Sequence, residues 1–165
     1  MFQVRDCEHV LAPMERCFLL ATHLQITADA LIMNTVPGEG LRSGGLVQKD
    51  DLVHWEGRRF GLRQTHIYRI SRFEPPTFFQ ERMERGSFRR FEHDHHFSQV
   101  GAHTLMLDYV RFSLPMGPAG RLVGKQMMLP RVVRLVRLRL QMLKRIAESE
   151  EWRQYLPAEI EVAAG

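Results

Sequence analysis

The chain has 165 residues, of which 44% are hydrophobic and 25% charged, and this composition is typical of one globular domain. No apolar run reaches the ~18 to 20 residues of a membrane-spanning helix, and the charges throughout the first 16 residues argue against a secretory signal. We therefore expect one domain over residues 1–165 that does not cross a membrane and that resides in the cytoplasm.

The net charge of +4 is unevenly spread along the chain. Residues 118–148 hold eight Lys or Arg residues and a single acid, Glu148, whereas the rest of the chain has more acidic than basic residues. We interpret this segment as a solvated helix face or, alternatively, as a surface that meets an acidic partner or acidic lipid.

The first third of the chain predicts one strand and two short helices. Residues 2–10 have the β-branched and aromatic character of a strand, and a helix follows that has Pro13 near its N-terminus. A second short helix is expected between Thr22 and Leu31. Residues 34–45 contain four glycines and one proline, and they lack the Gly-Lys-Ser/Thr ending of a phosphate-binding loop. This segment is therefore predicted to be an irregular loop.

The middle of the chain predicts strand after strand, separated by short links that contain glycine or proline. Short links between neighbouring strands favour an antiparallel meander. The expected strands cover residues 51–60, 62–70, 77–84, 87–97 and 103–114.

A long helical pattern follows from Arg121 to about Ser149, and Pro130 should kink or divide it. The tail from about residue 157 shows no periodicity. A sheet of this size must bury one face, and the terminal helix is the element large enough to cover it. The predicted fold class is therefore α+β, with a curved antiparallel sheet wrapped around a long C-terminal helix.

The stretch RRFEHDHHF, residues 89–97, carries the polar residues of most interest. Side chains on a strand alternate between the two faces of the sheet. Phe91, His93, His95 and Phe97 therefore share one face, which we expect to point inward. The opposite face is entirely polar and is expected to meet solvent; it consists of Arg90, Glu92, Asp94, His96 and Ser98.

A turn centred on residues 100–103 would pair this strand with the next one. The predicted partners are Phe97 with Met106, His95 with Asp108, His93 with Val110, and Phe91 with Phe112. This register places a buried carboxylate beside a histidine. On the terminal helix, Arg139 lies in the middle of the apolar face formed by Val132, Leu135, Val136, Leu143 and Ile146, so it needs a buried anion as partner. Asp108 is its expected partner.

His93, His95, Asp108 and Arg139 thus form a predicted polar cluster in an apolar interior. The four groups could simply satisfy one another, anchor a ligand, or perform acid–base catalysis. No metal or other cofactor is expected, because no further inward Cys or Glu is evident and Arg139 would repel a cation.

The order of elements and several motifs resemble the SRPBCC superfamily, the START and polyketide-cyclase-like ligand-binding proteins, over about residues 2–148. The motifs are the aromatic-x-His-x-His strand at residues 91–95, Asp108, the turn from Leu114 to Pro118, and Arg139 in the terminal helix. The resemblance implies the helix-grip fold, in which the curved sheet grips the terminal helix and leaves a deep apolar cavity.

The resemblance also implies a lipid, polyketide or quinone-like molecule as partner. The residues expected to bind it are Phe91, His93, His95, Phe97, Asp108, Phe112 and Arg139. Other aromatic residues that could extend the apolar wall are Phe2, Trp55, Phe60, Tyr68, Phe73, Phe78 and Phe79.

Two other functions remain open from the sequence. The first is an enzyme of cyclase or dehydratase type, in which His95 exchanges a proton, Asp108 orients it and Arg139 stabilises an oxyanion. The second is an interaction module that docks on acidic lipid or protein through a basic helix face. That face consists of Arg131, Arg134, Arg137, Lys144 and Arg145. Binding of nucleic acid is not expected, because no aromatic residues suited to base stacking lie among them.

Overall fold

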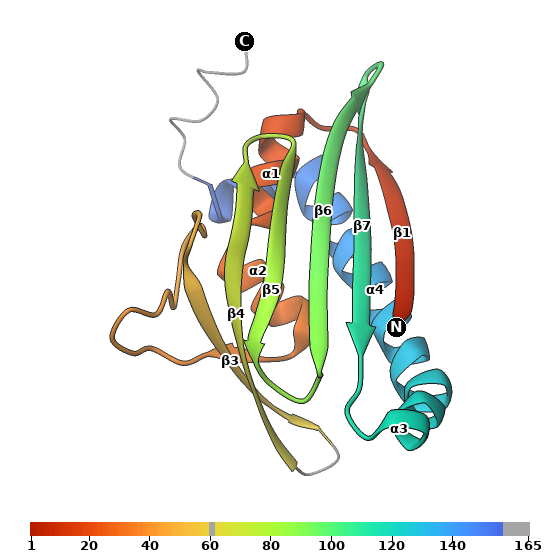
Figure 1. The fold of residues 1–165 in the computed structure, drawn as a ribbon. Helices are drawn as coiled ribbons and strands as arrows, with labels where there is room; N and C mark the ends of the chain where they lie inside the picture. Colours follow the sequence, from red (N-terminus) through yellow and green to blue (C-terminus); the bar gives the residue numbers. More distant parts are fainter. Residues whose placement is uncertain (60–61, 157–165) are drawn as a thin grey trace.

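A curved antiparallel sheet dominates the computed structural model, which describes residues 1–59 and 62–156 (Figure 1). The predicted irregular tail and Phe60 lie outside these residues. The strands are β1 (Phe2–Val10), β2 (Asn34–Thr35), β3 (Leu52–Arg59), β4 (Leu62–Glu74), β5 (Phe78–Arg85), β6 (Arg90–Val100) and β7 (His103–Ser113). The helices are α1 (Met14–Ala21), α2 (Leu24–Leu31), α3 (Gly117–Val123), η1 (Gly124–Met128), α4 (Leu129–Glu148) and η2 (Glu150–Gln154).

The strands form one seven-stranded sheet in the order β1-β7-β6-β5-β4-β3-β2, and every neighbouring pair is antiparallel. Strands β3 to β7 follow one another as the predicted meander, whereas β1 joins the far edge beside β7. Within the predicted loop, Asn34 and Thr35 add a short edge strand to β3. The predicted α+β fold class is confirmed.

The register of the β6–β7 hairpin agrees with the prediction from the sequence. His95 lies opposite Asp108, His93 opposite Val110, and Phe91 opposite Phe112. The turn between the strands contains Gly101 at a φ of 60°, a backbone conformation that glycine adopts without the steric cost of a Cβ atom. A tight turn of fixed length thereby sets which side chains of the two strands meet.

Helices α1, α2 and α4 lie on the same side of the sheet (Figure 1). The apolar face of α4 supplies the buried residues Val132, Val136, Leu140, Leu143 and Ile146, which pack with the inward side chains of the sheet and with α1. A second, smaller group of buried side chains lies beneath α2, beside β3 and β4; it contains Leu24, Ala28, Val47, Val53, Trp55 and Ile70.

The terminal helix is divided by a π-helical turn and not by a sharp break at Pro130. The N–H of Leu129 donates to the carbonyl of Gly124, five residues earlier, and Pro130, which has no N–H, follows in the first turn of α4. The helical run also begins earlier than predicted, at Gly117. A side chain at Gly124 would collide with the ring of Phe2, so glycine allows this turn to touch β1.

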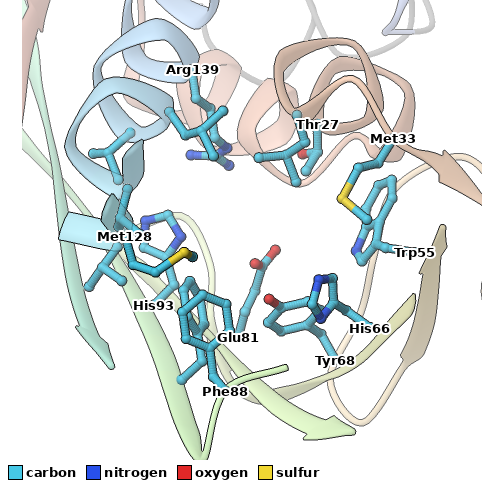
Figure 2. A pocket seen from close by; sticks show the side chains of 16 residues that line it. Thr27, Met33, Trp55, His66, Tyr68, Glu81, Phe88, His93, Met128 and Arg139 are labelled. Atoms are coloured by element: carbon cyan, nitrogen blue, oxygen red, sulfur yellow. The ribbon is translucent and has the colours of Figure 1, made fainter. Parts of the chain in front are cut away.

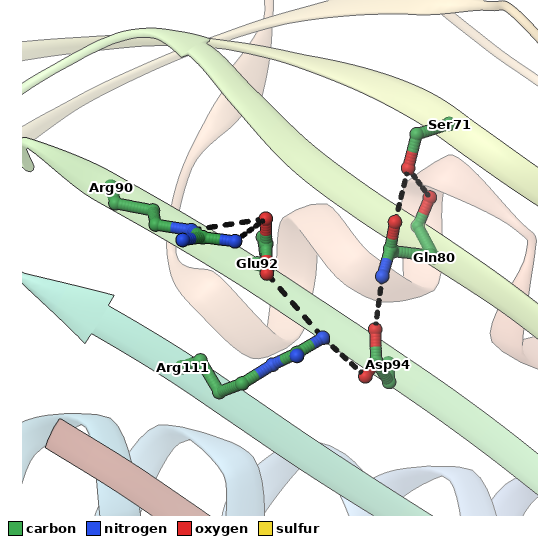
Figure 3. A network of polar contacts seen from close by, with 6 residues as sticks. All are labelled: Ser71, Gln80, Arg90, Glu92, Asp94 and Arg111. Atoms are coloured by element: carbon green, nitrogen blue, oxygen red, sulfur yellow. Dashed lines mark hydrogen bonds and ion pairs between the residues drawn. The ribbon is translucent and has the colours of Figure 1, made fainter. Parts of the chain in front are cut away.

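The outer face of β6 differs from the prediction, because two of its acids are buried. The side chains of Glu92 and Asp94 are only 8% and 12% exposed. Arg111 on β7 reaches both, with its Nη2 2.7 Å from Asp94 Oδ2 and 3.4 Å from Glu92 Oε2 (Figure 3). Arg90 Nη2 lies 2.8 Å from Glu92 Oε1, and the Gln80 amide donates to Asp94 at 2.6 Å. Long polar side chains thus cover the two carboxylates, while His96 and Ser98 are exposed as expected.

Candidate functional site

A cavity opens between α4, α2 and the concave face of the sheet (Figure 2). Its volume, the room it offers to the centres of water-sized molecules, is about 100 Å³. Most of its wall is aliphatic or aromatic, and a few polar groups converge on it, as in typical small-molecule sites. The lining residues are Thr27, Leu31, Met33, Trp55, His66, Tyr68, Glu81, Phe88, Phe91, His93, Val110, Met128, Val132, Leu135, Val136 and Arg139.

Asp108 is the centre of a polar cluster behind this cavity. Its Oδ1 lies 2.8 Å from His95 Nδ1, and its Oδ2 lies 3.2 Å from Arg139 Nη1. His93 Nε2 is 3.1 Å from Oδ2, which is an ion-pair distance without the direction of a hydrogen bond. The structure therefore brings together all four residues of the predicted cluster.

Arg139 connects three elements at this point. It is 4% exposed, and besides its contact with Asp108 its Nη2 donates to the carbonyl of Ala21 at 2.8 Å. Ala21 is the last residue of α1, where unpaired carbonyls carry partial negative charge. A guanidinium with several donors in a fixed plane suits this arrangement. Arg139 thus holds α4 against both the sheet and the end of α1.

The charges of the cluster are divided between Asp108 and Arg139. Burial alone would raise the pKa of Asp108, but His95, His93 and Arg139 outweigh burial and hold this pKa well below its ordinary value. Burial also lowers the pKa of His95 well below its ordinary value, an effect that His93 and Arg139 reinforce and Asp108 opposes. At neutral pH the cluster therefore contains an ionised carboxylate, a guanidinium and a neutral His95.

The contacts of His95 also determine its tautomer. A nitrogen 2.8 Å from an ionised carboxylate must carry a proton, so Nδ1–H donates to Asp108. The 3.2 Å approach of Arg139 Nη1 to the same nitrogen is then a contact between two donors. His95 Nε2 is left with its lone pair, is buried, and has no hydrogen-bond partner among the described residues.

The predicted ligand-binding residues fall into two groups. Phe91, His93 and Arg139 line the cavity. The other four are buried but are not part of the lining: His95, Phe97, Asp108 and Phe112. Their inward orientation agrees with the predicted alternation, yet they lie behind the wall. Of the predicted catalytic residues, only Arg139 reaches the cavity, so a direct reaction of His95 or Asp108 with a ligand stays a prediction.

The prediction from the sequence missed Glu81 and His66, which also line the cavity. Glu81 lies directly opposite His93 in the β5–β6 pairing, two residues after Phe79, which pairs with His95. In Figure 2 its carboxylate points into the same space as the His93 ring. Alternation along Phe78–Arg85 places Glu81 on the same face of β5 as Phe79. Only the pairing register of β5 with β6 shows that Glu81 lies opposite His93. Trp55 and Tyr68 line the cavity as suggested from the sequence.

Much of the basic face of α4 is neutralised within the chain. Arg137 Nε lies 3.1 Å from Asp6, Lys144 Nζ lies 3.5 Å from Glu8, and Arg145 forms an ion pair with Glu151. The first two contacts join α4 to β1. These residues therefore contribute to the packing of α4 on the sheet as well as to the surface charge.

Comparison with known proteins connects this architecture to solved structures. No family model and no curated protein matches the sequence. The Zhui aromatase/cyclase from Streptomyces sp. R1128 has a TM-score of 0.71 at 17% identity, covering 95% of this chain and 97% of that one. A START superfamily protein from Mycobacterium smegmatis has a TM-score of 0.62 at 11% identity, covering 87% and 98%. The major latex-like protein 151 from Panax ginseng has a TM-score of 0.54 at 10% identity, covering 94% and 98%.

The chain has the helix-grip fold of START-like proteins. At these identities the likeness shows the fold alone, and the resemblance noted in the sequence is confirmed at that level. In this helix-grip structure, none of the described helices is long and apolar enough to cross a membrane. The site itself must be interpreted from its own residues.

Proposed function

We propose that the protein binds a hydrophobic small molecule, such as a lipid, polyketide or quinone-like compound, in the cavity beneath α4. The observation that carries this proposal is the mainly apolar wall with a few polar groups at one side. Burial of the apolar part of a ligand against Trp55, Phe91 and Val132 would supply the driving force. His93, Glu81 and Arg139 would orient a polar group of the ligand.

The proposal is tested by filling the cavity from α4. Val132 lines the cavity and is 6% exposed, whereas Leu138 on the same helix is 44% exposed and does not line it. The uncharged fluorescent probe N-phenylnaphthylamine is titrated into the wild type, Val132→Phe and Leu138→Phe, and its binding is followed by fluorescence. We expect Val132→Phe to weaken binding at least about tenfold, equivalent to about 1.4 kcal/mol, and Leu138→Phe to leave it unchanged.

Circular dichroism and thermal unfolding of each variant would show that the fold is retained. Failure of the wild type to bind the probe, or equal binding by both variants, would contradict the proposal. Native mass spectrometry of the purified protein, compared with its denatured mass, would then identify the class of any co-purifying ligand.

A cyclase or dehydratase activity is a second candidate, because a histidine backed by a carboxylate lies on the cavity wall. His93 lines the cavity and its Nε2 lies 3.1 Å from Asp108. In this scheme His93 exchanges a proton with the bound ligand, Asp108 orients the ring from behind, and Arg139 stabilises developing negative charge. His93→Gln would then abolish turnover and retain binding of the product.

Docking through the basic face of α4 is a weaker candidate, because Arg137, Lys144 and Arg145 pair with acids of the same chain. Its signature would be association with vesicles of acidic lipid that is lost in high salt. The cytoplasmic location expected from the sequence stays a prediction.

A further inference from the structure

We propose that Glu81, His93 and His95 form a binding site for a divalent transition-metal ion on the inner wall of the cavity. One ring nitrogen of each histidine and one carboxylate oxygen of Glu81 all lie within 4.8 Å of one another. The proposal does not depend on the organic ligand of the preceding section, because these residues would hold the ion without it.

The backbone fixes this arrangement through two neighbouring strands. Glu81 and His93 are direct partners in the β5–β6 ladder, and His95 follows two positions later on the same face of β6. The two imidazole rings lie 3.8 Å apart between centroids. Metal–nitrogen and metal–oxygen bonds are about 2.0 to 2.2 Å long, so the three donors need to close by roughly 1 Å to share one ion. The flexible Glu81 side chain can provide most of this movement.

Asp108 orients His95 from the side away from the site. Metal-binding histidines usually donate their second ring N–H to a carboxylate or a carbonyl, which fixes the tautomer and the orientation of the ring. His95 Nδ1 lies 2.8 Å from Asp108 and fits this description, whereas His93 Nε2 approaches the same carboxylate at 3.1 Å without the direction of a hydrogen bond. His95 Nε2 is consequently a buried lone pair without a hydrogen-bond partner among the described residues. Such a lone pair is costly unless something binds it.

The balance of charge also favours a cation here. Arg139 is engaged by Asp108, at 3.2 Å, and by the carbonyl of Ala21, at 2.8 Å. It approaches His95 at the Nδ1 edge of the ring, opposite to Nε2. Within the described part of the chain, the Glu81 carboxylate has no hydrogen bond or ion pair that would offset its charge. The expectation of no metal assumed no inward acid beside the histidines, and Glu81 supplies that acid.

Two imidazoles and one carboxylate are a donor set for zinc or a similar first-row ion, and not for magnesium or calcium, which prefer oxygen. Three protein ligands leave at least one coordination position for water or for a polar group of a ligand. Because His93 and Glu81 line the cavity, that position would face the cavity.

The test uses the metal alone. Protein freed of metal with a chelator is titrated with Co²⁺ while its visible absorption is recorded, and Zn²⁺ is then added to displace the Co²⁺. We expect one ion per chain and absorption typical of a four- or five-coordinate site, with no binding of Mg²⁺. Glu81→Gln should weaken binding by more than about 100-fold, beyond the usual effect of changing an outer-shell group.

Two matched variants control for adventitious binding. Glu84→Gln removes an exposed acid from β5, and His96→Gln removes an exposed histidine from β6. Both should bind Co²⁺ like the wild type. His93→Gln provides a second loss-of-ligand variant, and circular dichroism checks that each protein is folded.

Two results would overturn the proposal: no binding by the wild type, or binding that Glu81→Gln and His93→Gln leave unchanged. Val132→Phe separates this proposal from the preceding one, because it should exclude the apolar probe and retain the metal. Retention of the probe with loss of the metal in Glu81→Gln would support both functions independently.

Discussion

The two faces of β6 each bury acidic or basic side chains, but in different ways. On the inner face, Asp108 meets His95 and Arg139, and all three side chains are at most 5% exposed. On the outer face, Asp94 and Glu92 are covered by Arg111, whose own side chain is 27% exposed. The inner cluster joins the sheet to α4 and α1, whereas the outer network joins neighbouring strands only (Figure 3).

This difference shows how each carboxylate is stabilised. An inner charge has no access to water, so removing its partner leaves an uncompensated charge. An outer carboxylate contacts arginines that remain hydrated, and water can replace a lost partner. The inner face should therefore be far more sensitive to substitution.

The largest expected effect is that of Asp108→Ala. This change leaves Arg139 buried without its anion, and we expect the free energy of unfolding to fall by about 3 to 5 kcal/mol. Urea denaturation followed by circular dichroism measures this quantity.

A double variant tests the reason for that loss. Asp108→Leu combined with Arg139→Met removes both charges and should cost less than Asp108→Ala alone. If the double variant is the least stable protein, the contacts of Arg139, and not its unpaired charge, dominate the stability of the inner cluster.

A smaller effect is expected from pH, because the pKa of His95 is lowered in the folded state. Below its ordinary value of 6.5, the unfolded chain binds a proton that the folded chain does not bind. The free energy of unfolding should therefore fall as pH decreases below about 6.5, by up to ~1.4 kcal/mol per pH unit for this group.

His95→Gln should reduce this slope, while His96→Gln, on the outer face, should retain it. Urea denaturation at several pH values, with a chelator present, measures the slopes. Half-buried His23, whose pKa burial also lowers, contributes equally to all three proteins. Equal slopes in the wild type, His95→Gln and His96→Gln would show that folding does not lower the pKa of His95.

The smallest effect is expected for Asp94→Ala on the outer face. Asp94 loses contacts with Arg111 at 2.7 Å and Gln80 at 2.6 Å, but both partners can turn to solvent. We expect a loss of about 1 kcal/mol in the free energy of unfolding, measured by the same urea titration. A loss as large as that of Asp108→Ala would mean that the two faces are equally isolated from water.

The inner cluster was predictable because local rules determine it. Alternation along β6 places His93 and His95 on one face, and the short turn at Gly101 fixes Asp108 opposite His95. Helical periodicity places Arg139 on the apolar face of α4. An arginine and an aspartate in the same interior then have each other as the natural partner.

The burial of Asp94 and the position of Glu81 were not predictable in this way. The contact of Asp94 with Gln80 and the position of Glu81 depend on β5, whose register against β6 the sequence does not specify, because a longer link joins these strands. The distinction between residues that line the cavity and residues behind its wall, such as His93 and His95, depends on the curvature of the whole sheet. Alternation gives only the face of a strand on which a side chain lies.

The π-helical turn at Gly124–Met128 bears on how chain length can vary in this fold. Such a turn holds one residue more than an α-helical turn. Loss of one residue there would regularise the helix and rotate α3 by about 100° about its axis, while α4 stayed in place. The same deletion between Pro130 and Arg139 would turn Arg139 away from Asp108. Single-residue insertions and deletions should therefore accumulate before α4 and be excluded within it.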